Sequence, residues 1–321
     1  MNANARFLAA ILPIVALAPL NLATADQGGV AFWQSGQYAS EAAVPASPGW
    51  SLSSGVYGYG GKADASKAFM IGNSVVLGTK SHSAIFSLQP SYTPATTVLG
   101  GTVSLGLGFG GGYNRVSSSA VVASAEGGGV AHRSGSIWGA SDLAPLASLS
   151  WGHGANNWMT YVTGNIPVGS YNSQRIANIG IGHGAVDAGA AYTYQDAKSG
   201  LEFSAVGGLT YNLENFSTNY RNGIDSHLDY AASKSLSANT QLGIVGYLYY
   251  QLTGDSGSGA KLGPFESKVA AIGPEFGWQF NVGDQPWSAN VRGYYEFWAR
   301  DRVRGAAGFA TFSLPLGVPK K

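Results

Sequence analysis

The sequence predicts an all-β fold, a transmembrane antiparallel up-and-down β-barrel of about 12 strands, with a range of roughly 10–14. Apolar and polar residues alternate with a period of two in many segments, as in Leu201–Tyr211. The chain has no cysteine, and only 11% of its residues are charged, about half the usual share. A soluble sandwich would bury the apolar faces against each other, whereas a membrane barrel turns them towards lipid. Low charge and an export signal favour the barrel.

The N-terminus has the features of a secretory signal peptide, residues 1–25. Arg6 precedes an uncharged run over Phe7–Leu22, and small residues follow up to Ala25. A membrane anchor helix is the alternative, but Pro13 and Pro19 interrupt the run. We therefore predict cleavage after Ala25 and export to the bacterial outer membrane.

The rest of the chain divides into two parts. Residues 26–48 lack a clear period, and we expect a periplasmic N-terminal extension there. Residues 49–317 form the predicted barrel. Alternation places its strands, in order, at Trp50–Tyr59, Ser83–Tyr92, Gly101–Tyr113, Pro145–His153, Asn157–Pro167, Ala188–Gln195, Leu201–Asn212, His227–Ala238, Gln241–Thr253, Lys268–Val282, Trp287–Arg300 and Arg304–Leu316.

The connections between these strands alternate in length. Short turns are expected at 154–156, 196–200, 239–240 and 283–286, and long loops at 119–140, 168–187, 213–226 and 254–267. Residues 60–80 also read as a long loop, although 70–78 could pair. Bacterial barrels have short periplasmic turns and long outer loops. The short connection at 301–303 is an exception on the outer side.

Several segments of the last third resemble a known family. They include Thr210–Asn215, Gly246–Gly257, Ala271–Gly277 and Arg292–Phe297. They are similar to the outer-membrane transporter-like proteins described as a "putative MetA-pathway of phenol degradation". The resemblance implies a monomeric outer-membrane barrel associated with uptake of hydrophobic or aromatic compounds. It supplies no catalytic or ligand-binding residues.

The polar faces of the last strands carry the candidate functional residues. Arg292 and Glu296 lie four residues apart on one strand, about 13 Å, so their partners must come from neighbouring strands, with Glu275 the obvious candidate. The group forms either a charged belt that sets pore selectivity or a satisfied network that plugs and braces a narrow barrel. The predicted lumen-lining residues are His227, Asp229, Tyr247, Tyr249, Glu275, Gln279, Arg292, Tyr294, Glu296 and Arg300.

Two further patterns concern the outer wall. The aromatic clusters around Tyr247–Tyr250 and Tyr294–Trp298 fit girdles at the membrane interface, although Tyr247, Tyr249 and Tyr294 can instead line the lumen. Lys234 falls on the apolar face of its strand, so we expect it near a rim or beside a bulge.

These observations predict a passive channel. Its expected partners are small hydrophobic or aromatic solutes and outer-membrane lipid; a net charge of +1 argues against nucleic acid. No catalytic residue, cofactor or metal ligand is expected. The alternatives are a lipid hydrolase on the barrel rim, for which Ser226 and His227 are the available residues, and a structural barrel that conducts nothing.

Overall fold

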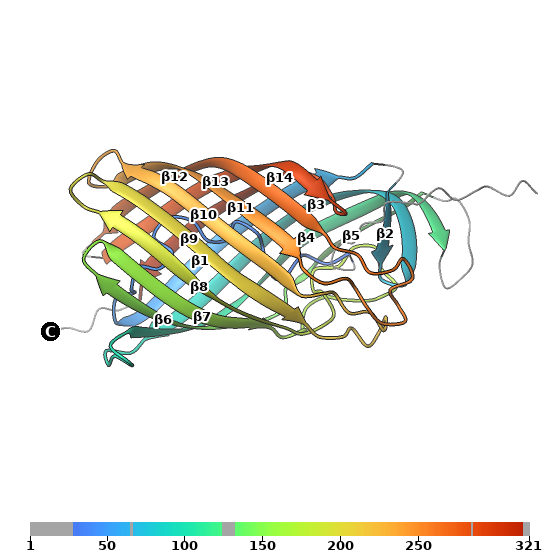
Figure 1. Ribbon diagram of the computed structural model, residues 1–321, viewed down its shortest axis with the longest axis horizontal. Helices are drawn as coiled ribbons and strands as arrows, with labels where there is room; N and C mark the ends of the chain where they lie inside the picture. Colours follow the sequence, from blue (N-terminus) through green and yellow to red (C-terminus); the bar gives the residue numbers. More distant parts are fainter. Residues whose placement is uncertain (1–27, 65–66, 124–131, 284, 317–321) are drawn as a thin grey trace, which may run out of the picture.

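A computed structural model describes residues 28–64, 67–123, 132–283 and 285–316. They form a closed antiparallel β-barrel with 12 strand positions (Figure 1). The ring closes because β1 pairs with the last strand, β14, on one side and with β3 on the other. The predicted signal peptide, residues 1–25, lies outside the described residues.

The strands follow the sequence around the ring. Their bounds are β1 Gly49–Lys62, β2 Ala68–Ile71, β3 Ser74–Thr93, β4 Thr102–Ala123, β5 Arg133–Ala140, β6 Ala144–His153, β7 Asn156–Asn165, β8 Ala185–Asp196, β9 Leu201–Asn212, β10 Asp225–Ser235, β11 Thr240–Gln251, β12 Lys268–Val282, β13 Gln285–Arg300 and β14 Arg304–Pro315. No helix long and apolar enough to cross a membrane occurs in the described part of the chain.

Two predicted loops are partly strand. β5 and β6 both pair with β4, β5 along its distal half and β6 along its first half, so together they fill one position in the ring. The expected loop 119–140 therefore contains the end of β4 and all of β5. The expected loop 60–80 likewise contains β2 and the start of β3, which pair with each other. Both regions are strand because a long hydrogen-bonded ladder continues there beyond the segments that alternate clearly.

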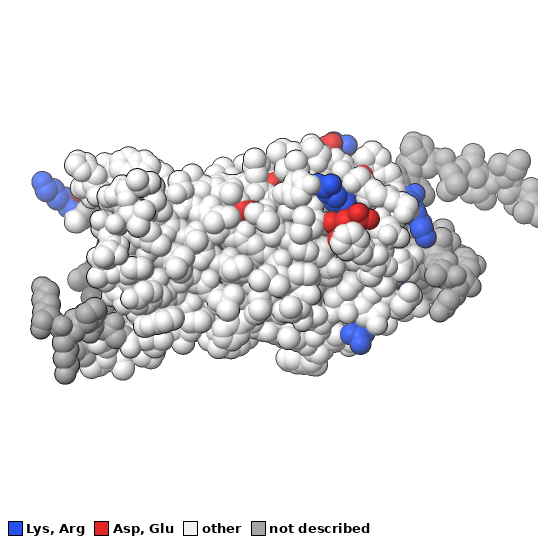
Figure 2. Space-filling model, turned by 90° about the horizontal axis from the view of Figure 1, so that it is seen from below, with Lys and Arg blue, Asp and Glu red and all other residues white. Residues whose placement is uncertain are grey.

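The barrel is turned inside out relative to a soluble protein. On β9, the apolar side chains of Phe203 and Leu209 are about half exposed, whereas Glu202 and Thr210 on the other face are each only 3% exposed. On the face shown in Figure 2, Lys and Arg lie towards the ends of the barrel, and the wall between them is almost free of these residues. This is the arrangement that lipid requires, with polar groups directed inward.

The connections distinguish the two ends of the barrel. The loops at 166–184, 213–224 and 252–267 lie at one end, which we call the long-loop end. The turns at 154–155, 197–200 and 236–239 lie at the other, the short-turn end. The brief connection 301–303 at the long-loop end is present as predicted. Lys234 lies one residue before the end of β10, so its expected place near a rim is confirmed.

Outward-facing aromatic pairs, each with one exposed tryptophan, mark both edges of the apolar wall. Towards the long-loop end, the ring centroids of Tyr113 and Trp138 are 5.3 Å apart. Towards the short-turn end, those of Trp278 and Phe280 are 4.6 Å apart. Of the two predicted clusters, the outward members, such as Tyr250 and Trp298, contact each other on the wall. Tyr247, Tyr249 and Tyr294 point inward, so the girdle and lumen interpretations each apply to one strand face.

Candidate functional site

Residues 28–48, which we call the N-terminal segment, run through the lumen from the long-loop end to the start of β1 (Figure 1). At the long-loop end, the carbonyl of Gly28 accepts hydrogen bonds from Asn178 N and Asn114 Nδ2. Nearer the short-turn end, Ala43 N donates to Thr193 Oγ1 over 3.0 Å. This course differs from the expected periplasmic extension. The segment lacks a period because its backbone polar groups bond to lumen side chains rather than to a sheet ladder.

Buried carboxylates of the barrel wall hold the segment by its backbone. Asp229, which is fully buried, accepts Gly36 N at 2.8 Å and Tyr38 N at 3.2 Å. Glu275 accepts both the backbone N and the Oγ of Ser40. Glu202 accepts Glu41 N at 2.9 Å. Three inward-facing acids on β9, β10 and β12 therefore hold the segment at successive points, and two of them, Asp229 and Glu275, are predicted lumen-lining residues.

Arg292, a cation, binds backbone carbonyls of the same segment. Its Nε donates to the carbonyl of Gly36 at 3.0 Å, and its Nη2 donates to the carbonyl of Gln37 at 2.6 Å. Glu275 lies opposite Arg292 in the β12–β13 register, as predicted, but Asn290 bridges the two side chains instead of a direct ion pair. The Arg292 guanidinium also lies 4.6 Å above the ring of Phe309.

Gly36 is the tightest point of the anchor. Its carbonyl also accepts Tyr294 Oη at 2.9 Å, and its φ of 84° is in the left-handed region. A Cβ at this position would lie 2.7 Å from the Tyr294 ring. Glycine is therefore required both by the backbone conformation and by the close approach of the ring.

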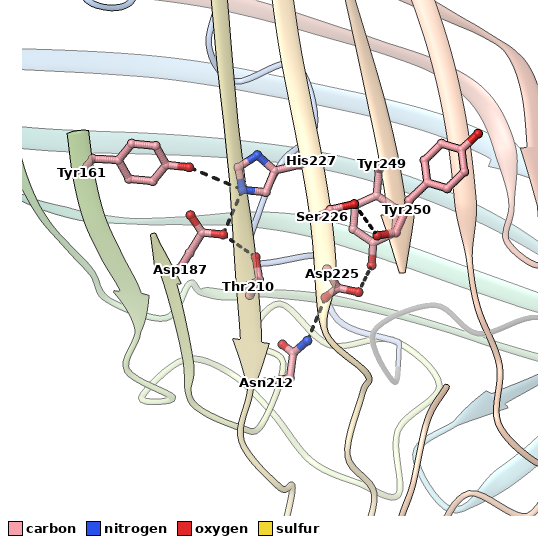
Figure 3. Close-up of polar contacts among 9 residues, drawn as sticks. All are labelled: Tyr161, Asp187, Thr210, Asn212, Asp225, Ser226, His227, Tyr249 and Tyr250. Atoms are coloured by element: carbon pink, nitrogen blue, oxygen red, sulfur yellow. Dashed lines mark hydrogen bonds and ion pairs between the residues drawn. The ribbon is translucent and has the colours of Figure 1, made fainter. Parts of the chain in front are cut away.

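His227 belongs to a second buried cluster, drawn in Figure 3. Its Nε2 lies 2.9 Å from Asp187 Oδ2, which also accepts Thr210 Oγ1. The Trp33 ring of the N-terminal segment stacks on the imidazole, with centroids 3.4 Å apart. Tyr161 Oη contacts the same imidazole nitrogen at 3.4 Å. The cluster thus packs an aromatic side chain of the segment against the wall formed by β7–β10.

A small cavity of about 130 Å³ lies between the N-terminal segment and the wall. Glu296, which is buried, accepts Tyr247 Oη at 2.9 Å and Tyr59 Oη at 3.0 Å, and Arg302 lies 3.7 Å away. Tyr249 Oη donates to Asp225. These bonds fix the hydroxyls of three tyrosines that line the cavity. Its aromatic lining is Phe32, Trp33, Tyr57, Tyr59, Tyr247 and Tyr249.

A second, larger cavity of about 1290 Å³ lies towards the short-turn end, and we call it the vestibule. Serines and glutamines such as Ser53, Gln89 and Ser148 make much of its lining. The two cavities share Phe32, Gln34 and Tyr57. The N-terminal segment therefore divides the lumen, and the two parts adjoin each other at Phe32, Gln34 and Tyr57.

The structure places the ten predicted residues in four settings. His227, Asp229, Glu275, Arg292 and Tyr294 contact the N-terminal segment or its cluster, and Tyr247, Tyr249 and Glu296 line the small cavity. Gln279 lines the vestibule near the short-turn end. Arg300 does not face the lumen: its side chain is 66% exposed and pairs with Asp301.

A β-bulge explains the position of Arg300. Ala271 pairs with Glu296 whereas Ala270 pairs with Trp298, so β13 carries one extra residue at Phe297. The extra residue reverses the alternation beyond it. Ala299 then faces inward and Arg300 outward.

Several residues of the site are absent from the prediction. Glu202 and Asp187 lie on polar strand faces, so alternation alone could have added them. Trp33 and Arg302 lie outside regular strands and carry no periodic signal. The available clue is chemical, because the inward faces carry more carboxylates than cations and buried carboxylates need donors from elsewhere.

The residues considered for hydrolase chemistry do not come together. Ser226 and His227 are adjacent on β10, and their side chains point to opposite faces (Figure 3). Ser226 Oγ donates to the carbonyl of Tyr250 on the outer wall, whereas His227 bonds to Asp187 in the lumen. A serine nucleophile requires its base within hydrogen-bond reach, and this pair does not meet that requirement.

Comparisons with known proteins agree with this architecture. Residues 65–312 match the family described as "Putative MetA-pathway of phenol degradation". No curated protein gave a significant match. An outer membrane channel from Pseudomonas putida F1 is 17% identical, with a TM-score of 0.63 over 84% of this chain and 97% of that chain.

Two weaker structural similarities involve other outer-membrane barrels. The translocator domain of autotransporter NalP from Neisseria meningitidis is 13% identical, with a TM-score of 0.44 over 83% of this chain and 88% of that chain. A Pseudomonas aeruginosa FadL homologue is 11% identical, with a TM-score of 0.40 over 84% of this chain and 75% of that chain. The likeness to the Pseudomonas putida channel, at 17% identity, concerns the fold alone.

Proposed function

The chain belongs to the family described as "Putative MetA-pathway of phenol degradation", and from that premise we propose that it is an outer-membrane channel for passive uptake of small hydrophobic or aromatic compounds. The long-loop end faces the outside and the short-turn end the periplasm, as loop lengths indicate. One chain closes the ring by itself, so a monomer suffices for the proposed channel. No energy source enters the proposal: the solute moves down its concentration gradient.

The observation that carries the proposal is the tyrosine-lined cavity. Its volume of about 130 Å³ is close to the roughly 150 Å³ of an apolar cavity that binds benzene. Tyr57, Tyr247 and Tyr249 are among its lining residues, and aromatic rings attract one another in stacked and edge-to-face geometries. A single-ring solute therefore matches both the size and the surface of this cavity.

The proposed route has two stages. A solute first enters the tyrosine-lined cavity from the long-loop end. It then passes the N-terminal segment at Phe32 and Gln34, which both cavities share, and reaches the polar vestibule. Gly36 and Tyr38, close to this point in the chain, bond the segment to the wall. The segment must therefore shift before a solute can pass.

The occupied lumen also favours a second candidate, a structural barrel that conducts nothing. Liposomes that contain the protein distinguish the two. We expect a labelled phenolic acid that crosses lipid slowly to enter these vesicles faster than empty ones. Equal entry rates would remove the channel function and leave the structural barrel.

Adjacent residues on β11 provide a matched pair for the same assay. Tyr249→Ala removes a ring from the cavity, whereas Tyr250→Ala removes one from the outer wall. Loss of an aromatic contact worth about 0.5–1.5 kcal/mol should raise the half-saturating concentration by about two- to tenfold. We expect that change for Tyr249→Ala and not for Tyr250→Ala. An equal effect of both would contradict binding in the cavity.

A further inference from the structure

Three cations lie side by side on the outer wall at the long-loop end. Lys62 on β1 pairs directly with Arg304 on β14 and with Lys80 on β3. All three side chains are exposed and share the outward face. Neighbouring strands are about 4.8 Å apart, so the three charges span roughly 10 Å. We call these residues the cationic row.

This arrangement is unfavourable for the isolated barrel. Like charges directly opposite each other in a sheet destabilise it. Among the described residues, none of the three forms an ion pair with a carboxylate, including the nearby Asp64. Elsewhere on the same rim, Lys268 pairs with Glu266 at 3.3 Å.

Further positive charge extends the row along the wall. Arg115 on β4 is exposed and lies opposite His82, which is two residues from Lys80 on β3. Gly60 lies opposite His82, and the imidazole packs over it: a Cβ at Gly60 would lie 3.3 Å from His82 Nδ1. The patch therefore covers four neighbouring strands, β14, β1, β3 and β4.

The row lies just beyond the apolar wall. Tyr113, whose ring packs on exposed Trp138, precedes Arg115 by two residues. Tyr and Trp prefer the membrane–water interface. Below it, Val56 and Phe86 are about half exposed on the same outward faces, six residues from Lys62 and Lys80 respectively. The cations therefore lie at the depth of lipid headgroups.

We propose that the cationic row binds the phosphate groups of a phosphorylated glycolipid, the lipid A part of lipopolysaccharide, in the leaflet that faces the long loops. Phosphate removes the repulsion between the three side chains, and the Arg304 guanidinium offers the two-point geometry that phosphate oxygens accept. The acyl chains of the same molecule would lie along Val56 and Phe86. The inference rests on the proposed orientation of the barrel, and it does not depend on any transported solute.

Native mass spectrometry of the full-length protein in a non-ionic detergent tests the proposal. The probes are lipid A with two phosphates, the same lipid without phosphates, and inorganic phosphate. We expect wild-type protein to retain the phosphorylated lipid at least about tenfold better than the dephosphorylated lipid. Equal retention of the two lipids, or displacement of lipid A by an equal concentration of inorganic phosphate, would overturn the proposal.

Variants locate the binding on the wall. Lys62→Gln, Lys80→Gln and Arg304→Gln together should weaken retention of lipid A about tenfold or more. The control, Arg175→Gln, Lys198→Gln and Lys261→Gln, removes the same charge from exposed positions outside the row and should retain the lipid. Heat-dependent migration on gels verifies folding, and Lys62→Glu alone should also weaken retention if the triple variant does not fold. Wild-type retention by a folded variant of the row would refute the assignment.

Discussion

Release of the N-terminal segment tests whether the buried carboxylates of the lumen hold it in place. Asp229→Asn keeps the size of the side chain, but it replaces one acceptor oxygen with an NH2 group. Because Asp229 accepts both Gly36 N and Tyr38 N, one of these two bonds is lost and two donors then face each other. The variant therefore weakens the anchor without opening a cavity.

The size of the effect follows from the lost bond. A hydrogen bond to a charged group contributes about 1.5–3 kcal/mol, and every 1.4 kcal/mol changes a population tenfold. The displaced state of the segment should therefore become about 12- to 140-fold more populated. Gly36→Ala should act in the same direction, because its Cβ would meet the Tyr294 ring.

Chemical labelling measures that population. The chain contains no cysteine, so Ser35→Cys introduces a unique thiol next to Gly36. A maleimide attached to a long polyethylene glycol chain is too bulky for the lumen and reacts when the segment is displaced. We expect Asp229→Asn in this background to accelerate labelling by the factor above.

The control for this experiment is a carboxylate remote from the segment. Asp255 is buried in the 252–267 loop and accepts Gln251 Nε2 and Gly223 N. Asp255→Asn should leave the labelling rate within about twofold of the parent. A rate for Asp229→Asn that also stays within twofold would refute the view that lumen carboxylates hold the segment.

Three further predictions concern the lumen. Deletion of residues 30–46 should leave the barrel assembled and raise its conductance in planar bilayers, with a preference for cations because Glu202, Asp229 and Glu275 lose their backbone donors; unchanged conductance would contradict a barrier role. Phe309→Ala should lower the free energy of unfolding by about 3–5 kcal/mol, measured by urea titration in lipid vesicles, because the ring is buried against Tyr57 and Arg292; a loss below about 1 kcal/mol would count against that packing. Burial raises the pKa of Glu41, and the nearby Glu202 and Glu275 raise it further, so docking of the segment favours protonated Glu41. Labelling of Ser35→Cys, measured relative to denatured protein at each pH, should increase as the pH rises from the ordinary carboxyl pKa through the raised one, and Glu41→Gln should flatten the profile.

The barrel wall could be predicted from the sequence because its physical cause is local. Lipid on one side and a polar lumen on the other force side chains to alternate, and the bounds of β9 and β12 match the predicted ones. A single extra residue in a strand leaves no such periodic signal in the sequence. The extra residue at Phe297 reversed the predicted direction of Arg300, although the residues around it remain a plausible strand.

The contents of the lumen could not be predicted because their cause is distant in sequence. Nothing in the sequence around Gly36 indicates that it is an anchor point, because its partners Asp229, Arg292 and Tyr294 are about 200 or more residues away. Two interpretations of the charged strand faces follow from the sequence, a charged belt around a pore and a satisfied network that plugs the barrel. The contacts between the lumen charges and the N-terminal segment agree better with the network. The sequence predicts Glu275 as a partner from the neighbouring strand; Glu275 and Arg292 do lie opposite each other, but they form no direct ion pair, and both bond to backbone groups of the segment.

The path of the N-terminal segment has a consequence for assembly. The hydrogen bonds that residues 36–43 make to the wall join residues 150 to 258 positions apart, so this part of the segment acquires its partners from strands that are made late. Contacts of such long range form slowly. Until β12 and β13 are in place, Ser40 lacks its acceptor Glu275, and the Gly36 carbonyl lacks its donors Arg292 and Tyr294. The β1–β14 seam can close only around a segment that already lies inside, or the segment must thread afterwards through an open end. A chain cut before β12 would lack the seam and the part of the anchor that Glu275, Arg292 and Tyr294 supply.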